Sequence, residues 1–146
     1  MTARLDPWKE APELMQAVLG LEKAASSAGL EYSLYELIKT RVSQINGCAY
    51  CLHMHTKDAR KAGETEERLY LLSAWRESSY YSPRERAALA WAESLTLVSR
   101  KGAPQSVYDE VCQHFNEHER VALTLAISTI NVWNRFAIGF SSQHPA

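Results

Sequence analysis

Hydrophobic residues recur at intervals of three and four along nearly the whole chain, which is the spacing of one face of an α-helix. The two clearest stripes are Leu14, Val18 and Leu21, and then Leu34, Leu37, Ile38, Val42 and Ile45. There is no run of alternating β-branched residues and no hairpin signal between strand-like segments. The pattern therefore predicts an all-α protein.

Helix-start and helix-stop signals divide this pattern into six or seven helices. Capping-box sequences stand at 82–85 and 116–119, and Asn46-Gly47 fits a left-handed helix end. The predicted helices cover residues 11–27, 33–46, 48–63, 65–76, 82–100, 104–115 and 116–139. Because no repeat or low-complexity linker divides the chain, we expect a single helical domain over residues 1–146, built as an orthogonal or bundled array.

Composition narrows the class of protein further. At 146 residues, with 46% hydrophobic residues and a net charge of -1, the chain can bury a core without disulfide staples and carries no basic run for nucleic acid. The N-terminal segment lacks the apolar stretch of a signal peptide. The stretch from Val121 to Ile130 is interrupted by polar residues, which makes it too short and too polar for a membrane span. We expect a soluble cytoplasmic protein.

Two cysteines, Cys48 and Cys51, lie three residues apart at the predicted start of the helix over 48–63, and His55 follows one turn later. At about 100° per residue these three side chains share one face of the helix, whereas His53 points to the opposite side. Unpaired N–H groups at a helix start favour a thiolate, and a nearby imidazole can take up the proton. The second sulfur can then form a disulfide with the oxidised first sulfur. The spacing predicts a redox-active dithiol.

Other uses of these cysteines stay open at this point. The two sulfurs and His55 could supply three zinc ligands, with Glu36 or His53 as the fourth, although no second ligand pair of the kind that structural zinc sites use is apparent. Alternatively, both could be inert and buried. The third cysteine, Cys112, stands alone in the helix predicted over 104–115. We expect it to be buried in the core as a small hydrophobic residue.

Glu36 is a further candidate for acid–base chemistry. It lies on the helix predicted over 33–46, before the dithiol. Together with Ser33 it could form a capping box, which is a purely structural role. If instead the turn after this helix folds it back along the next one, Glu36 would face His55 or a thiol and could hold or relay a proton.

The pattern Glu36-x11-Cys48-x2-Cys51-x3-His55 resembles the core motif of the AhpD-like alkylhydroperoxidases, a family within the carboxymuconolactone decarboxylase superfamily. The segment over 37–63 is similar to the family core throughout. A lone Cys-x-x-Cys would carry little information, but four residues at this spacing in an all-helical chain are specific.

A second stretch, Asn-Val-Trp-Asn-Arg at 131–135, is similar to the Asn-x-x-Asn-Arg sequence common in the same family. We expect Asn131, Asn134 and Arg135 to serve packing and helix contacts rather than catalysis. The resemblance extends over most of the chain, from about residue 32 to residue 139.

The resemblance implies an all-α fold and a thiol peroxidase activity. In the family pattern Cys51 corresponds to the peroxidatic cysteine, and Cys48 to the resolving cysteine and the more accessible partner for a reductant. His55 and Glu36 correspond to a proton relay. The resemblance also implies a homo-oligomer, a trimer or hexamer, that is reduced by a thiol or a dihydrolipoamide-linked system and has no bound cofactor or metal.

One position departs from the family pattern. The best-known member has a histidine directly before its second motif cysteine, where this chain has Tyr50. A phenol with a pKa near 10 is a poor base at neutral pH, so proton transfer through this position is not expected and the rate and reductant can differ.

Two other functions are compatible with the sequence. A lyase of the carboxymuconolactone decarboxylase type needs general acid–base groups but not the dithiol, so the presence of both cysteines argues against it. A non-enzymatic helical oligomer could use the dithiol as a redox sensor or as a metal clip.

Overall fold

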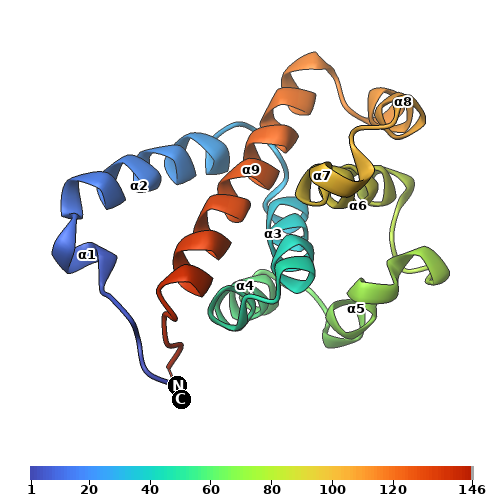
Figure 1. Ribbon diagram of the computed structural model, residues 1–146. Helices are drawn as coiled ribbons and strands as arrows, with labels where there is room; N and C mark the ends of the chain where they lie inside the picture. Colours follow the sequence, from blue (N-terminus) through green and yellow to red (C-terminus); the bar gives the residue numbers. More distant parts are fainter. Residues whose placement is uncertain (146) are drawn as a thin grey trace.

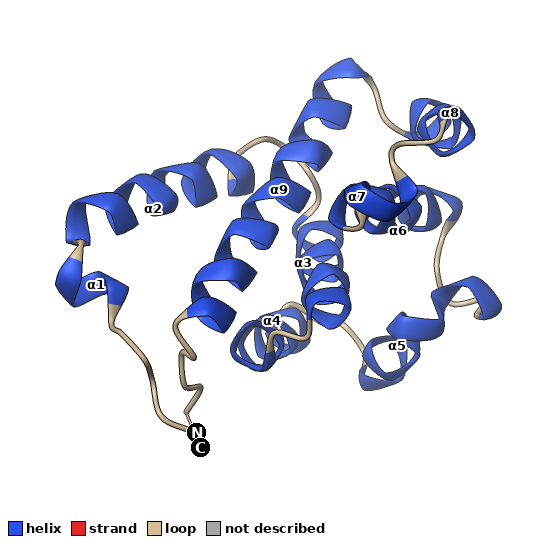
Figure 2. Cartoon of the chain, in the orientation of Figure 1, coloured by secondary structure: helices blue, strands red, loops and turns tan. Residues whose placement is uncertain are grey.

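Helices joined by short turns make up the computed structural model, which describes residues 1–145 (Figure 1). No strand occurs in these residues, so the predicted all-α class is confirmed (Figure 2). The elements are α1 (Pro7–Glu10), α2 (Pro12–Ser26), α3 (Tyr32–Asn46), α4 (Ala49–Lys61), α5 (Glu66–Leu71), the 3-10 helix η1 (Leu72–Glu77), α6 (Pro83–Thr96), α7 (Val98–Lys101), α8 (Gln105–His114) and α9 (Glu117–Gly139).

Each of the seven predicted helices is present, and the additional elements are short. The predicted helix over 82–100 is interrupted at Leu97, where φ is -102° and ψ is 33°, and it resumes as α7. The predicted helix over 65–76 tightens into η1 after Leu71, with a kink at Ala74. Both predicted capping boxes form, at the starts of α6 and α9.

Helix α3 lies at the centre of the molecule, where it packs against α4, α6 and α9 (Figure 1). Most of its stripe of apolar side chains is buried, with Leu37, Ile38 and Val42 between 0% and 1% exposed, while Ile45 at its end is half-buried. The same helix carries Glu36, so the central position of α3 places this carboxylate inside the core.

The stripe expected on α2 is rotated relative to the sequence prediction. Leu14 is 61% exposed, whereas its neighbour Met15 is 1% exposed and faces the inside. One residue corresponds to about 100° of rotation, so a small error in the helix face exchanges the two side chains.

Among residues 1–145, α9 is the one helix that is long and apolar enough to cross a membrane, judged by length and composition alone. The apolar stretch from Val121 to Ile130, which is too short for a membrane span, is only part of this longer helix. In the fold this helix packs against α2, α3 and α6, and side chains such as Leu123, Ile127 and Ile130 are buried in the protein core. Of its most apolar stretch, 39% is buried inside the protein, so core packing accounts for part of its apolar character.

The N-terminal segment runs back to the end of α9 (Figure 1). The backbone N–H of Arg4 donates to the carbonyl oxygen of Phe140 at 2.9 Å, and the Arg4 guanidinium donates to the carbonyl oxygen of Gly139 at 3.1 Å. The Trp8 ring also lies nearly parallel to that of Trp133, with ring centroids 6.2 Å apart. These contacts hold the N-terminal segment over the end of α9.

Candidate active site

The site begins at the turn between α3 and α4. Gly47 takes a left-handed conformation, with φ of 70° and ψ of 36°, and ends α3 as predicted. The N–H of Cys48 donates to the carbonyl oxygen of Ser43 at 3.0 Å, which closes the turn. Cys48 is therefore the N-cap of α4, and α3 and α4 form the hairpin that brings Glu36 towards His55.

A side-chain network from α9 anchors this turn. The amide of Asn46 donates to the side-chain oxygens of Asn131 and Asn134 at 3.0 and 2.9 Å, and the amide of Asn134 donates to the hydroxyl of Ser43 at 3.0 Å. Arg135 donates to the backbone and side-chain oxygens of Asn131. The Asn-x-x-Asn-Arg stretch thus serves helix contacts, as predicted, and those contacts hold the dithiol turn.

The sulfurs of Cys48 and Cys51 lie at disulfide-bonding distance, with Cα atoms 5.3 Å apart. The backbone N–H of Cys51 donates to Cys48 Sγ at 3.3 Å, so the helix start favours negative charge on that sulfur. Cys48 is 1% exposed and Cys51 is 2% exposed, so both sulfurs are buried and solvent exposure does not distinguish them. Only Cys51 lines the large cavity described below.

His55 and Glu36 form a buried pair. His55 Nδ1 lies 2.9 Å from Glu36 Oε2, and both residues are 3% exposed. A carboxylate oxygen accepts in this contact, so Nδ1 carries the hydrogen and Nε2 is the other ring nitrogen. Nε2 is buried and has no hydrogen-bond partner among the described residues. The imidazole is thus oriented by Glu36, with its free nitrogen available to take a proton.

The alternative capping role of Glu36 is wrong. Helix α3 begins at Tyr32, and its N-cap is Glu31, which makes no side-chain capping bond. Ser33 therefore lies within the first turn and not before it. Of the two readings that the sequence left open, the structure supports the one in which the carboxylate of Glu36 faces His55.

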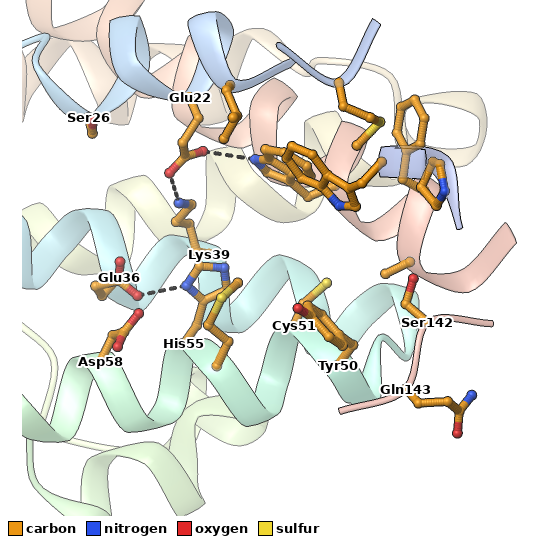
Figure 3. A pocket seen from close by; sticks show the side chains of 18 of the residues that line it. Glu22, Ser26, Glu36, Lys39, Tyr50, Cys51, His55, Asp58, Ser142 and Gln143 are labelled. Carbon is orange, nitrogen blue, oxygen red and sulfur yellow. Dashed lines mark hydrogen bonds and ion pairs between the residues drawn. The ribbon is translucent and has the colours of Figure 1, made fainter. Parts of the chain in front are cut away.

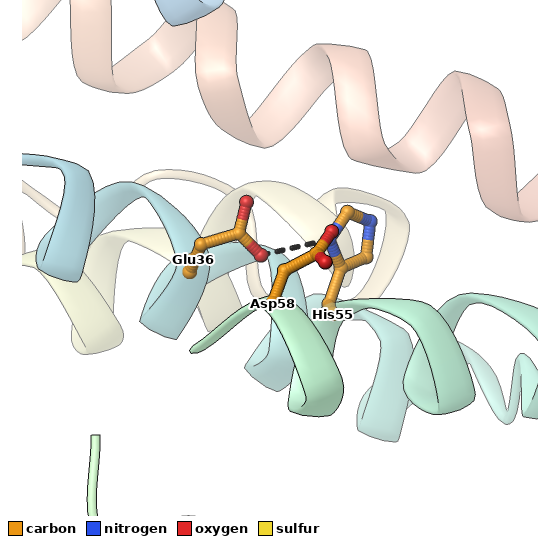
Figure 4. Close-up of side chains that lie close together, drawn as sticks. All are labelled: Glu36, His55 and Asp58. Atoms are coloured by element: carbon orange, nitrogen blue, oxygen red, sulfur yellow. Dashed lines mark hydrogen bonds and ion pairs between the residues drawn. The ribbon is translucent and has the colours of Figure 1, made fainter. Parts of the chain in front are cut away.

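Asp58 lies beside this pair, one turn beyond His55 on α4 (Figure 4). Each of Glu36, His55 and Asp58 offers one atom that could bind a metal ion, and these three atoms lie within 4.8 Å of one another. Burial and the two carboxylates raise the pKa of the nearby Tyr32 phenol. His55 Nδ1 is hydrogen-bonded to Glu36, so these three side chains form an acid–base cluster around that bond. Two members of the zinc donor set considered from the sequence, the sulfurs of Cys48 and Cys51, lie at disulfide-bonding distance from each other in this structure.

A cavity of about 750 Å³ opens onto Cys51 and His55 (Figure 3). In Figure 3 the carboxylates of Glu36 and Asp58 lie at one end, His55 comes next, and Cys51 lies beyond it along the same side of α4. Tyr50 lines the cavity beside Cys51, so the position that departs from the family pattern belongs to the site. The other walls come from the N-terminal segment, α2, α3 and α9.

The opposite wall contains an ion pair that the sequence analysis missed. Lys39 is 3% exposed and ion-pairs with Glu22, which also accepts from the Tyr35 hydroxyl at 2.8 Å and from Trp133 Nε1 at 3.1 Å. Burial alone would raise the pKa of Glu22, but the hydrogen bond and charge of Lys39 outweigh it, and the pKa is lowered. Lys39 follows Glu36 by three residues and therefore lies on the same face of the helix. This spacing could have placed Lys39 near the site from the sequence alone.

Two further side chains had sequence expectations. His53 lies outside the cavity lining and stacks on His144 with ring centroids 4.9 Å apart, so it is separate from the relay as predicted. Cys112 is exposed, which contradicts the expectation that it is buried. Its neighbour Val111 is 0% exposed and takes the inward position instead.

This arrangement agrees with the comparison with known proteins. The model of the carboxymuconolactone decarboxylase family matches residues 12–94, and the chain belongs to this family as an AhpD-like member. The uncharacterized protein YdfG of Bacillus subtilis is 45% identical over 143 residues, which cover 98% of this chain and 97% of YdfG.

Two solved structures show the same fold. A crystal structure of an Agrobacterium tumefaciens protein of unknown function, which its description connects with the antioxidant defence protein AhpD, superposes with a TM-score of 0.97 at 44% identity and 99% coverage of both chains. The debrominase Bmp8 superposes with a TM-score of 0.84 at 24% identity, over 94% of this chain and 74% of Bmp8. The Bmp8 likeness concerns the fold alone.

Proposed function

We propose that this protein is a thiol-dependent peroxidase that reduces hydroperoxides through a dithiol–disulfide cycle of Cys48 and Cys51. The observation that carries the proposal is the position of Cys51. Its sulfur lies at bonding distance from Cys48, and it lines the same cavity as His55 and Glu36. Membership of the AhpD-like family supports a peroxidase-like role in general terms.

In the proposed first step, His55 Nε2 takes the proton of the Cys51 thiol while its Nδ1–H remains bonded to Glu36, which stabilises the imidazolium. The thiolate attacks the terminal oxygen of the hydroperoxide, and the O–O bond breaks. Cys51 becomes a sulfenic acid, and the departing alkoxide takes the proton from His55 and leaves as an alcohol. The substrate is thus reduced by two electrons that the sulfur supplies.

In the second step, the sulfur of Cys48 attacks the sulfenic sulfur of Cys51. The S–S bond forms, the S–O bond breaks, and the hydroxyl group takes the proton of the Cys48 thiol and leaves as water. An external dithiol, such as a dihydrolipoamide-linked one, then exchanges with the disulfide, restores both thiols and becomes a disulfide itself. The Cα separation of 5.3 Å lies within the range that a disulfide requires, so this closure needs little backbone movement.

Peptide mass spectrometry of the reduced protein tests the cycle. One equivalent of cumene hydroperoxide should remove two hydrogen atoms from the protein, join the Cys48 and Cys51 peptides and yield one equivalent of alcohol. With a dithiol reductant present, hydroperoxide consumption should continue over many turnovers. Unchanged thiols under excess hydroperoxide would overturn the proposal, and retained decarboxylase activity in a Cys48→Ser/Cys51→Ser protein would favour the lyase.

We also propose a second candidate reaction for the same dithiol, reductive dehalogenation. The aromatic lining of the cavity, with Trp8, Tyr50 and Trp133, suits a halogenated ring. In this reaction an aryl bromide and two thiols would give the dehalogenated ring, a disulfide and hydrogen bromide. Bromide release from a bromopyrrole, measured beside peroxide consumption under the same reductant, separates the two activities.

We also propose that the chain acts as a homo-oligomer, a trimer or a hexamer. The resemblance to the AhpD-like family carries this proposal, and Leu14, Val98 and Val121, which are 61%, 56% and 69% exposed, are available for contacts between subunits. Sedimentation velocity at micromolar concentration should give a mass three or six times that of the chain. A monomer under these conditions would contradict the assembly but not the chemistry.

A further inference from the structure

The cavity is far larger than the reacting group of a hydroperoxide. Its volume is about 750 Å³, whereas a water molecule occupies about 30 Å³ of liquid, and hydrogen peroxide has only one more oxygen atom. Cavities of this size hold ligands with an extended body, most of whose surface becomes buried. The substrate of the proposed reaction should therefore carry a body that fills the space beyond Cys51.

The wall beyond Cys51 is apolar and aromatic. Trp8 and Trp133 face each other with their rings inclined by 19° and their centroids 6.2 Å apart, and Tyr50, Met54 and Phe136 complete this part of the lining. Flat aromatic faces favour contact with a planar or compact apolar group. Trp8 is 45% exposed and lies on the four-residue helix α1, so it can shift to admit such a group.

Acidic side chains outnumber basic ones in the cavity lining. The carboxylates of Asp6, Glu22, Glu36 and Asp58 line the cavity, against the single ammonium of Lys39 and the imidazole of His55.

Both basic side chains of the lining already have a carboxylate partner. Lys39 pairs with Glu22, and His55 pairs with Glu36, so Asp6 and Asp58 remain without a cationic partner in the lining. An entering carboxylate would meet these negative charges in a partly dehydrated space and would find no free cation.

We propose that this cavity binds an uncharged ligand with an aromatic or compact apolar body and rejects anionic ligands. This inference rests on the proposed function and deepens it, because it defines the hydroperoxide as a bulky, uncharged one and excludes free fatty-acid hydroperoxides. The aromatic wall holds the body of the ligand, and the peroxide group points to Cys51 and His55.

Calorimetric titration of the protein in its disulfide form tests the ligand class without requiring turnover. Indole-3-acetamide and indole-3-acetate have the same ring and nearly the same size but differ by one negative charge. The amide should bind at least about tenfold more tightly than the acetate, which corresponds to about 1.4 kcal/mol. Acetate binding as tight as amide binding, or no binding of either compound at millimolar concentration, would overturn the inference.

Variants locate the two contributions. Trp8→Ala should weaken amide binding about fivefold or more, whereas Tyr70→Ala, at a side chain that is 72% exposed and outside the cavity lining, should not change it. Asp58→Asn should reduce the preference for the amide, because it removes one negative charge from the wall. If Lys39→Gln abolishes tight acetate binding, Lys39 is a carboxylate receptor and the inference is wrong.

Turnover separates this inference from the proposed function. A fatty-acid hydroperoxide and its methyl ester share the same peroxide group and chain, and the ester should have the higher kcat/KM by about tenfold. Equal rates would overturn the charge selection while leaving the peroxidase in place. Preferential amide binding with no consumption of any hydroperoxide would remove the peroxidase and leave the ligand class standing.

Discussion

The two regions of the molecule that carry cysteine differ in the properties that control thiol chemistry. At the start of α4, Cys48 and Cys51 are 1% and 2% exposed and lie at bonding distance from each other. On α8, Cys112 is exposed and unpaired among the described residues, and its sulfur accepts from the Arg120 guanidinium at 2.9 Å. The buried pair has a partner sulfur, a base and a cavity, and the exposed cysteine has only a cation.

The comparison teaches that accessibility alone does not define a redox site. A cationic neighbour can stabilise a thiolate, but a lone thiolate that is oxidised has no second sulfur with which to form a disulfide. At the buried pair, the cavity admits a ligand to Cys51, and Cys48 lies close enough to complete the exchange. We therefore expect catalytic turnover only at the start of α4.

The largest effect is expected from Cys51→Ser, which removes the proposed nucleophile. Hydroperoxide turnover should fall by about 10³-fold or more, because Cys51 is the one cysteine that lines the cavity beside His55 among the described residues. The matched variant Cys48→Ser should still consume about one equivalent of hydroperoxide and then stop with Cys51 as a sulfenic acid, which only a second equivalent would convert to a sulfinic acid. Both are measured by peroxide consumption and mass spectrometry, and turnover that survives in Cys51→Ser would move the chemistry elsewhere.

A smaller loss is expected from His55→Gln, which removes the base but keeps a polar side chain. The rate of the first oxidation step should fall by about 10²-fold at pH 7, because proton transfer by a positioned side chain is typically worth that much. The rate of the variant should rise steeply with pH, since an unassisted cysteine ionises near pH 8.5. Stopped-flow kinetics over a range of pH measures both effects. His53→Gln on the same helix is the control, and an equal loss there would argue against the relay.

The sequence predicted much of what these experiments rely on. Helix boundaries followed from local signals such as the cap at Gly47 and the capping box at Asn116 and Glu119, so they could be located without tertiary information. The face shared by Cys51 and His55 followed from spacing within one helix. Glu36 on the neighbouring helix came from the family pattern, since spacing alone left its role open.

What the sequence could not supply falls into two kinds. Two errors of burial are shifts by one residue, since Met15 and Val111 are buried where Leu14 and Cys112 were expected. Periodicity defines a helix face only approximately, and the neighbouring helices decide which side chain fits.

The cavity could not be predicted from the sequence either. Its walls combine residues from both ends of the chain, such as Trp8 and Trp133, and no local sequence pattern indicates that these two rings are in contact.

A loss of stability rather than of chemistry is expected from Asn134→Ala. Asn134 is 0% exposed, and its removal leaves Asn46 and Ser43 without one buried partner each. The free energy of unfolding should fall by about 2–3 kcal/mol, as measured by urea denaturation. Arg120→Ala, beside Cys112, should cost less than about 1 kcal/mol, because its contacts are at the surface. Equal losses would mean that the dithiol turn is not held more firmly than α8.

The smallest effect is expected from Cys112→Ser. Its side chain is exposed and touches only the Arg120 guanidinium among the described hydrogen bonds, so the free energy of unfolding should change by less than about 0.5 kcal/mol. Hydroperoxide turnover should stay within about twofold of the unchanged protein, since the Cys48–Cys51 pair needs no third thiol. Both are checked by urea denaturation and by the same peroxide assay. A tenfold loss of turnover would mean that Cys112 takes part in the cycle, for instance in the exchange with the reductant, and the contrast between the two regions would no longer hold.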